Sequence, residues 1–312
     1  DIIMTPTILI TTSSFGKNDS APLEKLRKTG AEIILNPIGR KLSEDEILDL
    51  VRKYNPTGLL AGVEPLTAEV LGEAKSLKAI ARAGIGLDSV DQDAAKKLGI
   101  TVTNTPDAPT IPVAELTLGM ILSLLRMIHL SDASIRQGQW ERPMGNLLHG
   151  KTVGIIGCGR IGSRLAGYLC AFESRVIGYD PACESHQYVK IKDMDAVLAE
   201  SDIVSLHLPY SQNTHHFMDE TRIKAMKPGS YLINAARGGL VDEGALYQTI
   251  VDGHLAGAAL DCYEDEPYNG PLRNLKSTLL TAHIGSYAKE ARVMMETQAA
   301  ENLISQLKEV FK

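Results

Sequence analysis

Short apolar runs alternate along the chain with longer segments whose apolar residues repeat at helical spacing. In the first third of the chain these runs are 7–11, 32–35, 58–61, 78–82 and 101–104, with helical segments at 22–29, 43–54, 67–75 and 90–98. Ser43 followed by Glu46 reads as a capping box that begins one of these helices. Strands alternating with helices at this spacing are typical of a parallel sheet covered on both faces.

A second series follows a break at 105–110, where two prolines favour a loop or hinge. The helix predicted over 112–129 is apolar on nearly every side, so we expect it to be buried between domains or subunits. Further strands are predicted at 151–156, 175–179, 203–207, 230–234, 257–261 and 278–281, and a tail helix at 289–312. The pattern predicts an α/β protein with two Rossmann-like domains, the second matching a complete dinucleotide-binding fold.

The composition of the chain argues against several classes of function. Hydrophobic residues make up 44% and charged residues 22% of the 312 residues, which disfavours disorder. The net charge of -6 and the lack of a dense Lys/Arg run argue against a nucleic-acid partner. The longest apolar stretch, 111–125, contains Glu115 and is too short for a membrane span, so no membrane association is expected.

The cysteines and histidines do not show a metal-binding pattern. Four cysteines lack the spacing of a zinc site or a disulfide framework: Cys158, Cys170, Cys183 and Cys262. We expect free thiols and, because no signal peptide is visible, a cytoplasmic protein. His215-His216 are predicted to be loop histidines and no metal is expected, because adjacent residues do not chelate easily and no carboxylate motif accompanies them. Cys158 is expected to be a small filler residue, the alternative being an oxidation-sensitive thiol.

The strongest motif is a glycine-rich loop directly after the strand at 151–156. It reads Gly157-Cys158-Gly159-Arg160-Ile161-Gly162, and a helix is predicted at 163–171. Gly157 permits a tight turn, Gly159 lets a pyrophosphate approach the backbone, and Gly162 lets the helix and strand pack closely. The helix N-terminus then offers its free N–H groups to the phosphates. A glycine turn that binds nothing is the less favoured alternative, because a strand and a helix flank the motif.

The next strand ends at Asp180, 23 residues after Gly157. A carboxylate there can accept hydrogen bonds from the adenosine ribose hydroxyls and would repel a 2′-phosphate. The sequence therefore predicts NAD rather than NADP as the cofactor.

Three polar residues follow strands of the second series: Arg237, Glu266 and His283. Ligands of open α/β sheets collect at the carboxyl ends of strands, so we expect all three near the nicotinamide. Their types suit hydride transfer to a keto acid, with His283 as acid/base, Glu266 as the group that orients it, and Arg237 as the clamp for a substrate carboxylate. Each taken alone could instead be a structural or surface residue.

With these residues in place, the chain resembles the D-isomer-specific 2-hydroxyacid dehydrogenases. The resemblance rests on the glycine-rich loop and on the motifs at 234–243 (NAARGGLVDE), 259–267 (ALDCYEDEP) and 283–286 (HIGS). The motifs at 82–88, 104–106, 113–117 and 138–142 are similar to those of the D-3-phosphoglycerate dehydrogenase branch. The resemblance to the family covers nearly the whole chain.

The resemblance implies roles for particular residues. It makes Arg237, Glu266 and His283 the catalytic residues and lets the backbone of Ala83-Gly84-Ile85-Gly86 grip the substrate carboxylate together with Arg237 and His283. Its cofactor contacts fall on Gly157, Gly159, Arg160, Ile161, Gly162, Asp180, His207, Pro209, Ala235, Ala236, Arg237, Asp261, His283 and Gly285.

The resemblance also implies an organisation. A substrate-binding domain of 1–104 and 286–312 closes over an NAD-binding domain of 105–285 that is inserted into it. Members are typically homodimers with the helix at 112–130 in the interface. Because the sequence ends one helix after His283, we expect no serine-sensing domain of the kind that longer relatives carry.

The leading substrate is 3-phospho-D-glycerate, which would place the protein in serine biosynthesis. One departure matters: 61–64 contains no Arg or Lys, and Glu64 would repel a phosphate if it faced the site. Arg82 and Arg142 remain as candidate phosphate contacts, the alternative being ion pairs. Rival substrates are hydroxypyruvate, glyoxylate and phosphonate-bearing analogues. A rival from another class is a non-catalytic, NAD-sensing scaffold like the corepressors of the same fold.

Overall fold

A computed structural model describes residues 5–311, which form two compact units. One unit holds the chain up to Pro109 and again from Ser286 onward, and the other holds Thr110–Gly285. The division after Pro109 lies slightly beyond the boundary expected from the sequence. Thr105 stays with the first unit because its N–H donates to the Gly84 carbonyl at 3.0 Å and its hydroxyl oxygen accepts the Gly84 N–H at 2.7 Å.

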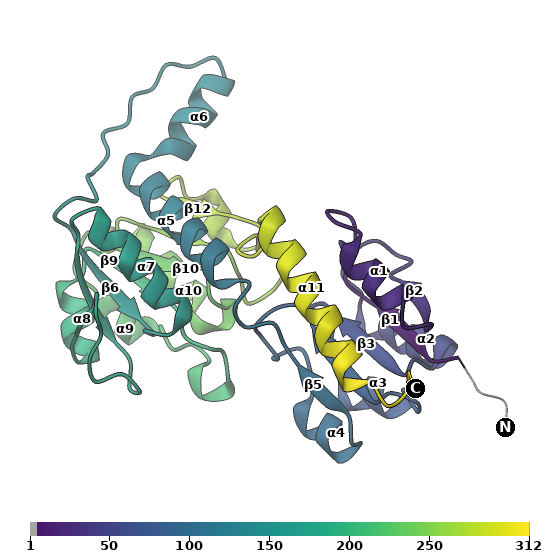
Figure 1. Cartoon of the computed structure of the whole chain (residues 1–312). Coiled ribbons are helices and arrows are strands. Elements are labelled where there is room, and N and C mark those ends of the chain that lie inside the picture. The colour runs from purple at the N-terminus through teal and green to yellow at the C-terminus, as the bar shows by residue number, and fades with distance from the viewer. Residues whose placement is uncertain (1–4, 312) are drawn as a thin grey trace. The chain divides into compact units, whose positions relative to one another are not determined.

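The described part of the first unit is built on a five-stranded parallel sheet in the order β2-β1-β3-β4-β5 (Figure 1). Its strands are β1 (Thr7–Ile10), β2 (Glu32–Leu35), β3 (Gly58–Ala61), β4 (Ala79–Arg82) and β5 (Thr101–Thr103). Its helices are α1 (Ala21–Arg27), α2 (Glu44–Tyr54), α3 (Ala68–Glu73), α4 (Gln92–Lys97) and α11 (Lys289–Gln306). The predicted capping box of Ser43 and Glu46 is confirmed at the start of α2.

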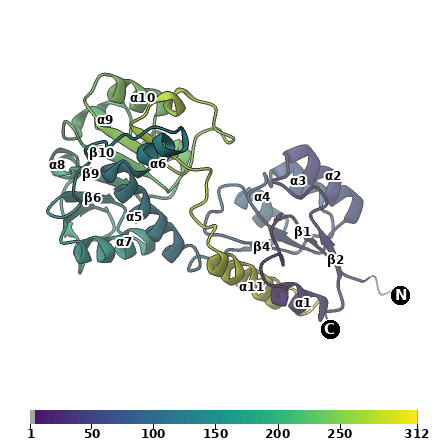
Figure 2. The ribbon, with the colours of Figure 1, turned by 90° about the horizontal axis from the view of Figure 1, so that it is seen from above.

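Alternating side chains divide the first unit into two hydrophobic layers. Ile8 and Ile10 pack with α1 and α11, whereas Leu9 between them packs with α2 and α3. Figure 2 shows the sheet lying between these two groups of helices. The helix α11 therefore completes the first unit although it comes from the far end of the chain, because the sheet needs an apolar cover on both faces.

The described part of the second unit contains a seven-stranded parallel sheet in the order β12-β11-β10-β9-β6-β7-β8. The strands are β6 (Thr152–Ile156), β7 (Arg175–Tyr179), β8 (Lys190–Ile191), β9 (Ile203–Leu206), β10 (Tyr231–Asn234), β11 (Gly257–Leu260) and β12 (Thr278–Leu280). Figure 2 shows α5 (Thr110–Arg126) and α7 (Arg160–Ala171) on one face, with α8 (Met194–Glu200), α9 (Glu220–Ala225) and α10 (Glu243–Val251) on the other. The two parallel sheets confirm the predicted α/β class.

Four details of the second unit and the tail differ from the sequence-based expectation. The helix predicted over 112–129 ends at Arg126, because Met127 takes a left-handed conformation (φ +54°) and α6 (Ile128–Arg136) begins after it. Most apolar side chains of α5, including Met120, Ile121 and Leu124, are buried in the core of their own unit, whereas Ile111 is 46% exposed. The tail helix, predicted over 289–312, ends at Gln306, and Lys312 lies outside the described residues. The two-residue strand β8 was not predicted.

No single helix of residues 5–311 is both long and apolar enough to cross a membrane. The helices α5 and α6 meet that test only as a pair, which is bent by 68° at the break between them.

Candidate active site

The glycine-rich loop joins β6 to α7 and depends on glycine at two positions. Gly157 has φ +97°, and a Cβ there would lie 2.6 Å from the His207 carbonyl oxygen. A Cβ at Gly162 would lie 2.1 Å from the Gly157 carbonyl oxygen. Gly159, the N-cap of α7, is different, because a Cβ there would meet no atom within 4 Å. Its outer side has the space that a pyrophosphate needs to approach the backbone.

The carboxylate of Asp180 is bonded to this loop. One of its oxygens accepts the Cys158 N–H at 2.8 Å and the other accepts the Ala182 N–H at 2.9 Å. Each carboxylate oxygen has a second lone pair, so both can still accept from ribose hydroxyls. The loop and Asp180 therefore fit the phosphates and the ribose of a dinucleotide.

His283 and Glu266 are in direct contact, which spacing along the chain could not show. Nδ1 of His283 lies 2.8 and 2.9 Å from the two carboxylate oxygens of Glu266. The carboxylate favours a proton on Nδ1, which leaves Nε2 for proton exchange with a ligand. The side chains of His283 and Glu266 are 40% and 31% exposed, so the pair is accessible from solvent in this unit.

The turn that carries His283 is held by Asp261. This buried carboxylate accepts the N–H groups of Ile284 and Gly285, each at 2.8 Å, and the Thr281 hydroxyl at 2.6 Å. His283 itself has φ +53°, which is uncommon for a residue other than glycine and needs support from its surroundings. The resemblance assigned Asp261 to the cofactor, and the structure adds a positioning role that no sequence motif reveals.

Arg237 begins the turn that follows β10. Asn234, buried at the end of that strand, donates its side-chain N–H to the Arg237 carbonyl at 2.9 Å and accepts the Ala236 N–H at 3.1 Å. Nη1 of Arg237 donates to the Ala236 carbonyl at 2.8 Å. Asn234 is a positioning residue that the sequence analysis did not single out, although a buried amide at the end of a strand is a usable signal.

Gly238 brings the Arg237 turn against the segment that carries Glu266. A Cβ on Gly238 would lie 1.8 Å from the Tyr263 carbonyl carbon. The N–H of Tyr263 in turn donates to Glu266 Oε1 at 3.2 Å. The second unit thus places the candidate catalytic residues on three turns after β10, β11 and β12, which are neighbours in the sheet.

The side chain of Glu64 is buried in the first unit and makes its hydrogen bonds there. Both of its carboxylate oxygens accept the Gly62 N–H at 3.1 Å, and Oε1 also accepts the Thr11 hydroxyl. Burial raises the pKa of Glu64, while these hydrogen bonds and nearby Arg82 act in the opposite direction. The carboxylate is therefore satisfied within its own unit.

Arg82 is buried under the predicted substrate loop. Its Nη1 donates to the Ala83 carbonyl at 2.5 Å, and a Cβ on Gly84 would lie 1.4 Å from that nitrogen. Arg82 thus supports the loop from within. By contrast, Arg142 lies in an exposed segment of the second unit after α6.

The four amides of the predicted substrate loop differ in their partners. The N–H of Ala83 donates to the Ala61 carbonyl at 2.9 Å, and that of Gly84 donates to Thr105. Within residues 5–311, the N–H groups of Ile85 and Gly86 make no hydrogen bond to the protein. The amides that remain for a carboxylate are therefore those of Ile85 and Gly86.

Two further residues near the glycine-rich loop are held in neutral forms. Burial lowers the pKa of His207 to about 4, and its Nε2 lies 2.9 Å from the Ser205 hydroxyl. Burial, together with nearby Asp180 and Cys183, raises the pKa of the Cys158 thiol to about 12. The second value favours the filler interpretation of Cys158. Pro209, also assigned to the cofactor, accepts the Thr214 hydroxyl through its carbonyl at 3.0 Å.

Fold and loop together define a dinucleotide-binding α/β protein, and similarity to known proteins narrows the class. Residues 118–285 match the model of the D-isomer specific 2-hydroxyacid dehydrogenase NAD binding domain. The chain is 36% identical over 296 residues to the hydroxypyruvate reductase of Thermotoga maritima, covering 91% of this chain and 96% of that protein. The chain belongs to the D-isomer-specific 2-hydroxyacid dehydrogenase family.

Other relatives differ in length and in the ligands named with them. The D-3-phosphoglycerate dehydrogenase of Archaeoglobus fulgidus is 37% identical over 294 residues, covering 92% of this chain and 55% of that protein. The chain thus spans about half the length of that relative. The crystal structure of the D-lactate dehydrogenase of Aquifex aeolicus, complexed with NAD and lactic acid, has a TM-score of 0.85 at 29% identity and covers 97% of this chain and 96% of its own.

Two glycines of the loop, Gly159 and Gly162, should respond differently to substitution by alanine. We expect Gly162→Ala to lower the free energy of unfolding by about 2–4 kcal/mol, because its Cβ would overlap the Gly157 carbonyl. Gly159→Ala should change that free energy by less than about 1 kcal/mol but weaken NADH binding at least tenfold. Urea denaturation and NADH fluorescence titration measure the two effects. Unchanged NADH affinity in Gly159→Ala would show that the pyrophosphate binds elsewhere.

His207 should make stability depend on acidity. The unfolded side chain has a pKa of about 6.5, whereas burial lowers the folded value to about 4. Since the folded state favours the neutral ring, its stability falls as pH drops from above 6.5 toward 4, by on the order of 2–3 kcal/mol from this group. Urea denaturation from pH 7 to 4.5 should show a smaller loss in His207→Gln than in the wild type. Parallel curves for the two proteins would contradict this assignment.

Proposed function

We propose that the protein is an NAD-dependent oxidoreductase that interconverts a D-2-hydroxy acid and its 2-keto acid. The observation that carries this proposal is the contact of Glu266 with His283 at the carboxyl edge of the same sheet that bears the glycine-rich loop. A binding loop alone requires no such acid/base pair. Family membership supports the same reaction class.

The cofactor is assigned from the loop and Asp180. NAD would be held by the N-terminus of α7 and by the Asp180 carboxylate, and when bound it supplies the hydride acceptor or donor. Asp180 disfavours a 2′-phosphate by charge repulsion. NADH should therefore bind more tightly than NADPH.

His283 is assigned the transfer of the proton of the substrate hydroxyl. In the direction of reduction, its Nε2 gives a proton to the oxygen that was the carbonyl, and in oxidation it takes that proton back. Glu266 stabilises the protonated imidazole through Nδ1 and keeps the ring oriented. Neutral His207 is not suited to this role, because its lowered pKa leaves it uncharged near neutral pH.

Arg237 and the loop at 83–86 are assigned to the substrate carboxylate. A guanidinium binds a carboxylate through two parallel hydrogen bonds and can polarise the adjacent carbonyl. The N–H groups of Ile85 and Gly86 add donors of the kind that suit an anion.

For the substrate itself, we propose 3-phospho-D-glycerate and 3-phosphohydroxypyruvate, which would connect the protein with serine biosynthesis. Relatives named D-3-phosphoglycerate dehydrogenase support this choice. The second candidate is hydroxypyruvate, with glyoxylate as a smaller analogue. It is favoured by the absence of Arg and Lys from 61–64, by the internal position of Arg82 and by the similar length of the Thermotoga hydroxypyruvate reductase.

A panel of keto acids tests activity and substrate together. NADH consumption would be followed with 3-phosphohydroxypyruvate, hydroxypyruvate, glyoxylate, pyruvate and a phosphonate analogue. We expect turnover, with the highest kcat/KM for 3-phosphohydroxypyruvate. His283→Ala should lower kcat by at least a hundredfold with little change in NADH affinity, since general acid/base catalysis contributes on the order of 10²–10⁴.

Two results would contradict the proposal. Tight NADH binding without turnover of any keto acid would favour the NAD-sensing scaffold instead. Retained turnover in His283→Ala would remove its role as proton donor. Turnover of hydroxypyruvate with none of its phosphorylated analogue would keep the reaction class and replace the substrate.

We further propose that the protein is a cytoplasmic homodimer. Large apolar side chains are exposed around α6 and the segment after it, with Trp140 81% and Met144 89% exposed. An exposed apolar patch of this kind is typical of an interaction surface. The helix α5, which the resemblance places in the interface, leads directly into this region.

Light scattering on a sizing column tests the dimer. The wild type should elute at twice the mass of the chain, and Trp140→Ser combined with Met144→Lys should shift it toward the monomer. Leu98→Lys, at an exposed apolar position of the first unit, is the matched control and should leave the dimer intact. A monomeric wild type, or equal shifts in both variants, would rule out this interface.

A further inference from the structure

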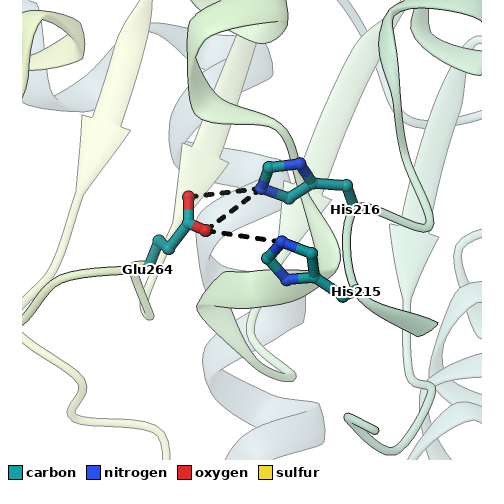
Figure 3. A group of neighbouring side chains, drawn as sticks. All are labelled: His215, His216 and Glu264. Carbon is teal, nitrogen blue, oxygen red and sulfur yellow. Dashed lines mark hydrogen bonds and ion pairs between the residues drawn. The ribbon is translucent and has the colours of Figure 1, made fainter. Parts of the chain in front are cut away.

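Two histidines and a glutamate converge in the second unit (Figure 3). The histidines follow the short 3-10 helix at Gln212–Thr214, and the glutamate lies on the turn after β11. Nε2 of His216 lies 3.1 and 3.3 Å from the two carboxylate oxygens of Glu264, and Nε2 of His215 lies 3.8 Å from Oε1. One ligand atom from each of the three residues lies within 4.8 Å of the others. Neither the glycine-rich loop nor the His283–Glu266 pair includes any of these side chains.

The backbone removes the objection that adjacent histidines cannot chelate. In an extended chain, successive side chains point in opposite directions. Here His216 has φ +47°, and the turn stacks its ring on that of His215 with centroids 3.9 Å apart and planes at 23°. Both imidazoles therefore present Nε2 toward Glu264, as Figure 3 shows.

A neighbouring hydroxyl orients the His215 side chain, and hydrogen bonds anchor the backbone of His216 and of Glu264. Nδ1 of His215 lies 3.2 Å from the Tyr210 hydroxyl. That oxygen can accept a hydrogen bond from Nδ1–H, which leaves Nε2 as the ligand atom. The N–H of Glu264 donates to Glu243 Oε1 at 2.8 Å, and the N–H of His216 donates to the Gly239 carbonyl at 2.8 Å. Each contributing segment is thus anchored independently of the cluster.

We propose that His215, His216 and Glu264 form a binding site for one Zn²⁺ ion, with the fourth position open to water. Imidazole nitrogen and carboxylate oxygen are zinc ligands, and bonds of about 2.0–2.2 Å hold tetrahedral ligand atoms roughly 3.3–3.5 Å apart. The distances of 3.1 and 3.3 Å between His216 and Glu264 are already close to that spacing, and the distance of 3.8 Å between His215 and Glu264 is slightly longer. Two further acidic side chains lie close to the cluster, since Glu243 accepts the Glu264 N–H at 2.8 Å and Asp265 follows Glu264 in the chain.

The proposed ion would join segments that also carry candidate catalytic residues. Glu264 lies two residues before Glu266, and Gly239, which accepts the His216 N–H, lies two residues after Arg237. A bound ion should therefore stabilise the second unit, because a ligand of the folded state alone raises its stability. This consequence does not depend on the enzymatic function proposed above.

Calorimetric titration of the tag-free, chelator-treated full chain with ZnCl₂ tests the site directly. We expect one equivalent of Zn²⁺ to bind per chain at the cluster, and we expect Tm to rise. When Co²⁺ replaces Zn²⁺, the absorption spectrum should be that of a tetrahedral site. His216→Ala and Glu264→Gln should each weaken this equivalent at least tenfold and abolish the Tm shift. His149→Ala is the matched control, because His149 pairs with Glu173 at 3.4 Å without a second histidine.

The variants also separate this site from other zinc-binding groups. His283→Ala removes the candidate catalytic imidazole and should retain the equivalent. Circular dichroism at 25 °C checks that each variant is folded. The proposal is overturned if the wild type binds no Zn²⁺, if the His216 and Glu264 variants bind it as the wild type does, or if His283→Ala loses the equivalent instead.

Discussion

The carboxylate of Asp261 is buried, and a buried charge is stable only when its oxygens are hydrogen-bonded. Its partners are two backbone N–H groups and one hydroxyl on the turn around His283. Satisfying this charge therefore fixes the left-handed conformation of His283. Once the turn is fixed, Nδ1 meets Glu266, and the proton-exchanging nitrogen is left for a ligand. The chemistry proposed for the site depends on this one buried acid.

The parallel sheet determines which residues can share the site. Strands β10, β11 and β12 are neighbours, so the turns that follow them emerge at one edge and carry Arg237, Glu266 and His283. The glycine-rich loop emerges at the same edge after β6, beyond β9. Positions up to 126 residues apart, from Gly157 to His283, are thereby brought to one edge by topology alone.

Features with a local cause could be predicted from the sequence. Strands buried on both faces need continuous apolar runs, so nearly all were found, whereas β8 is a two-residue strand without such a run. The capping box of α2 and the glycines of the loop have short motifs. The break at Met127 has none, since the apolar pattern continues through it and only the backbone conformation ends the helix.

Contacts made by folded turns could not be predicted in the same way. The bonds from Asp261 end on backbone N–H groups, which every residue possesses. Glu264 meets His216 across 48 positions because two turns pack together, so the pair of histidines appeared to lack a carboxylate. The sequence left open whether Glu64 faces the site, and only its hydrogen bonds to Thr11 and Gly62 show that its oxygens are used within the first unit.

The central claim is that the His283–Glu266 pair serves direct hydride transfer between NADH and C2 of a 2-keto acid. Transfer of isotope tests it most directly, with NADH carrying deuterium at C4 of the nicotinamide on the transferred side. Mass and NMR spectra of the product in ordinary water should show one deuterium at C2 and the D configuration. Product without deuterium at C2, or no product despite bound NADH, would contradict the account.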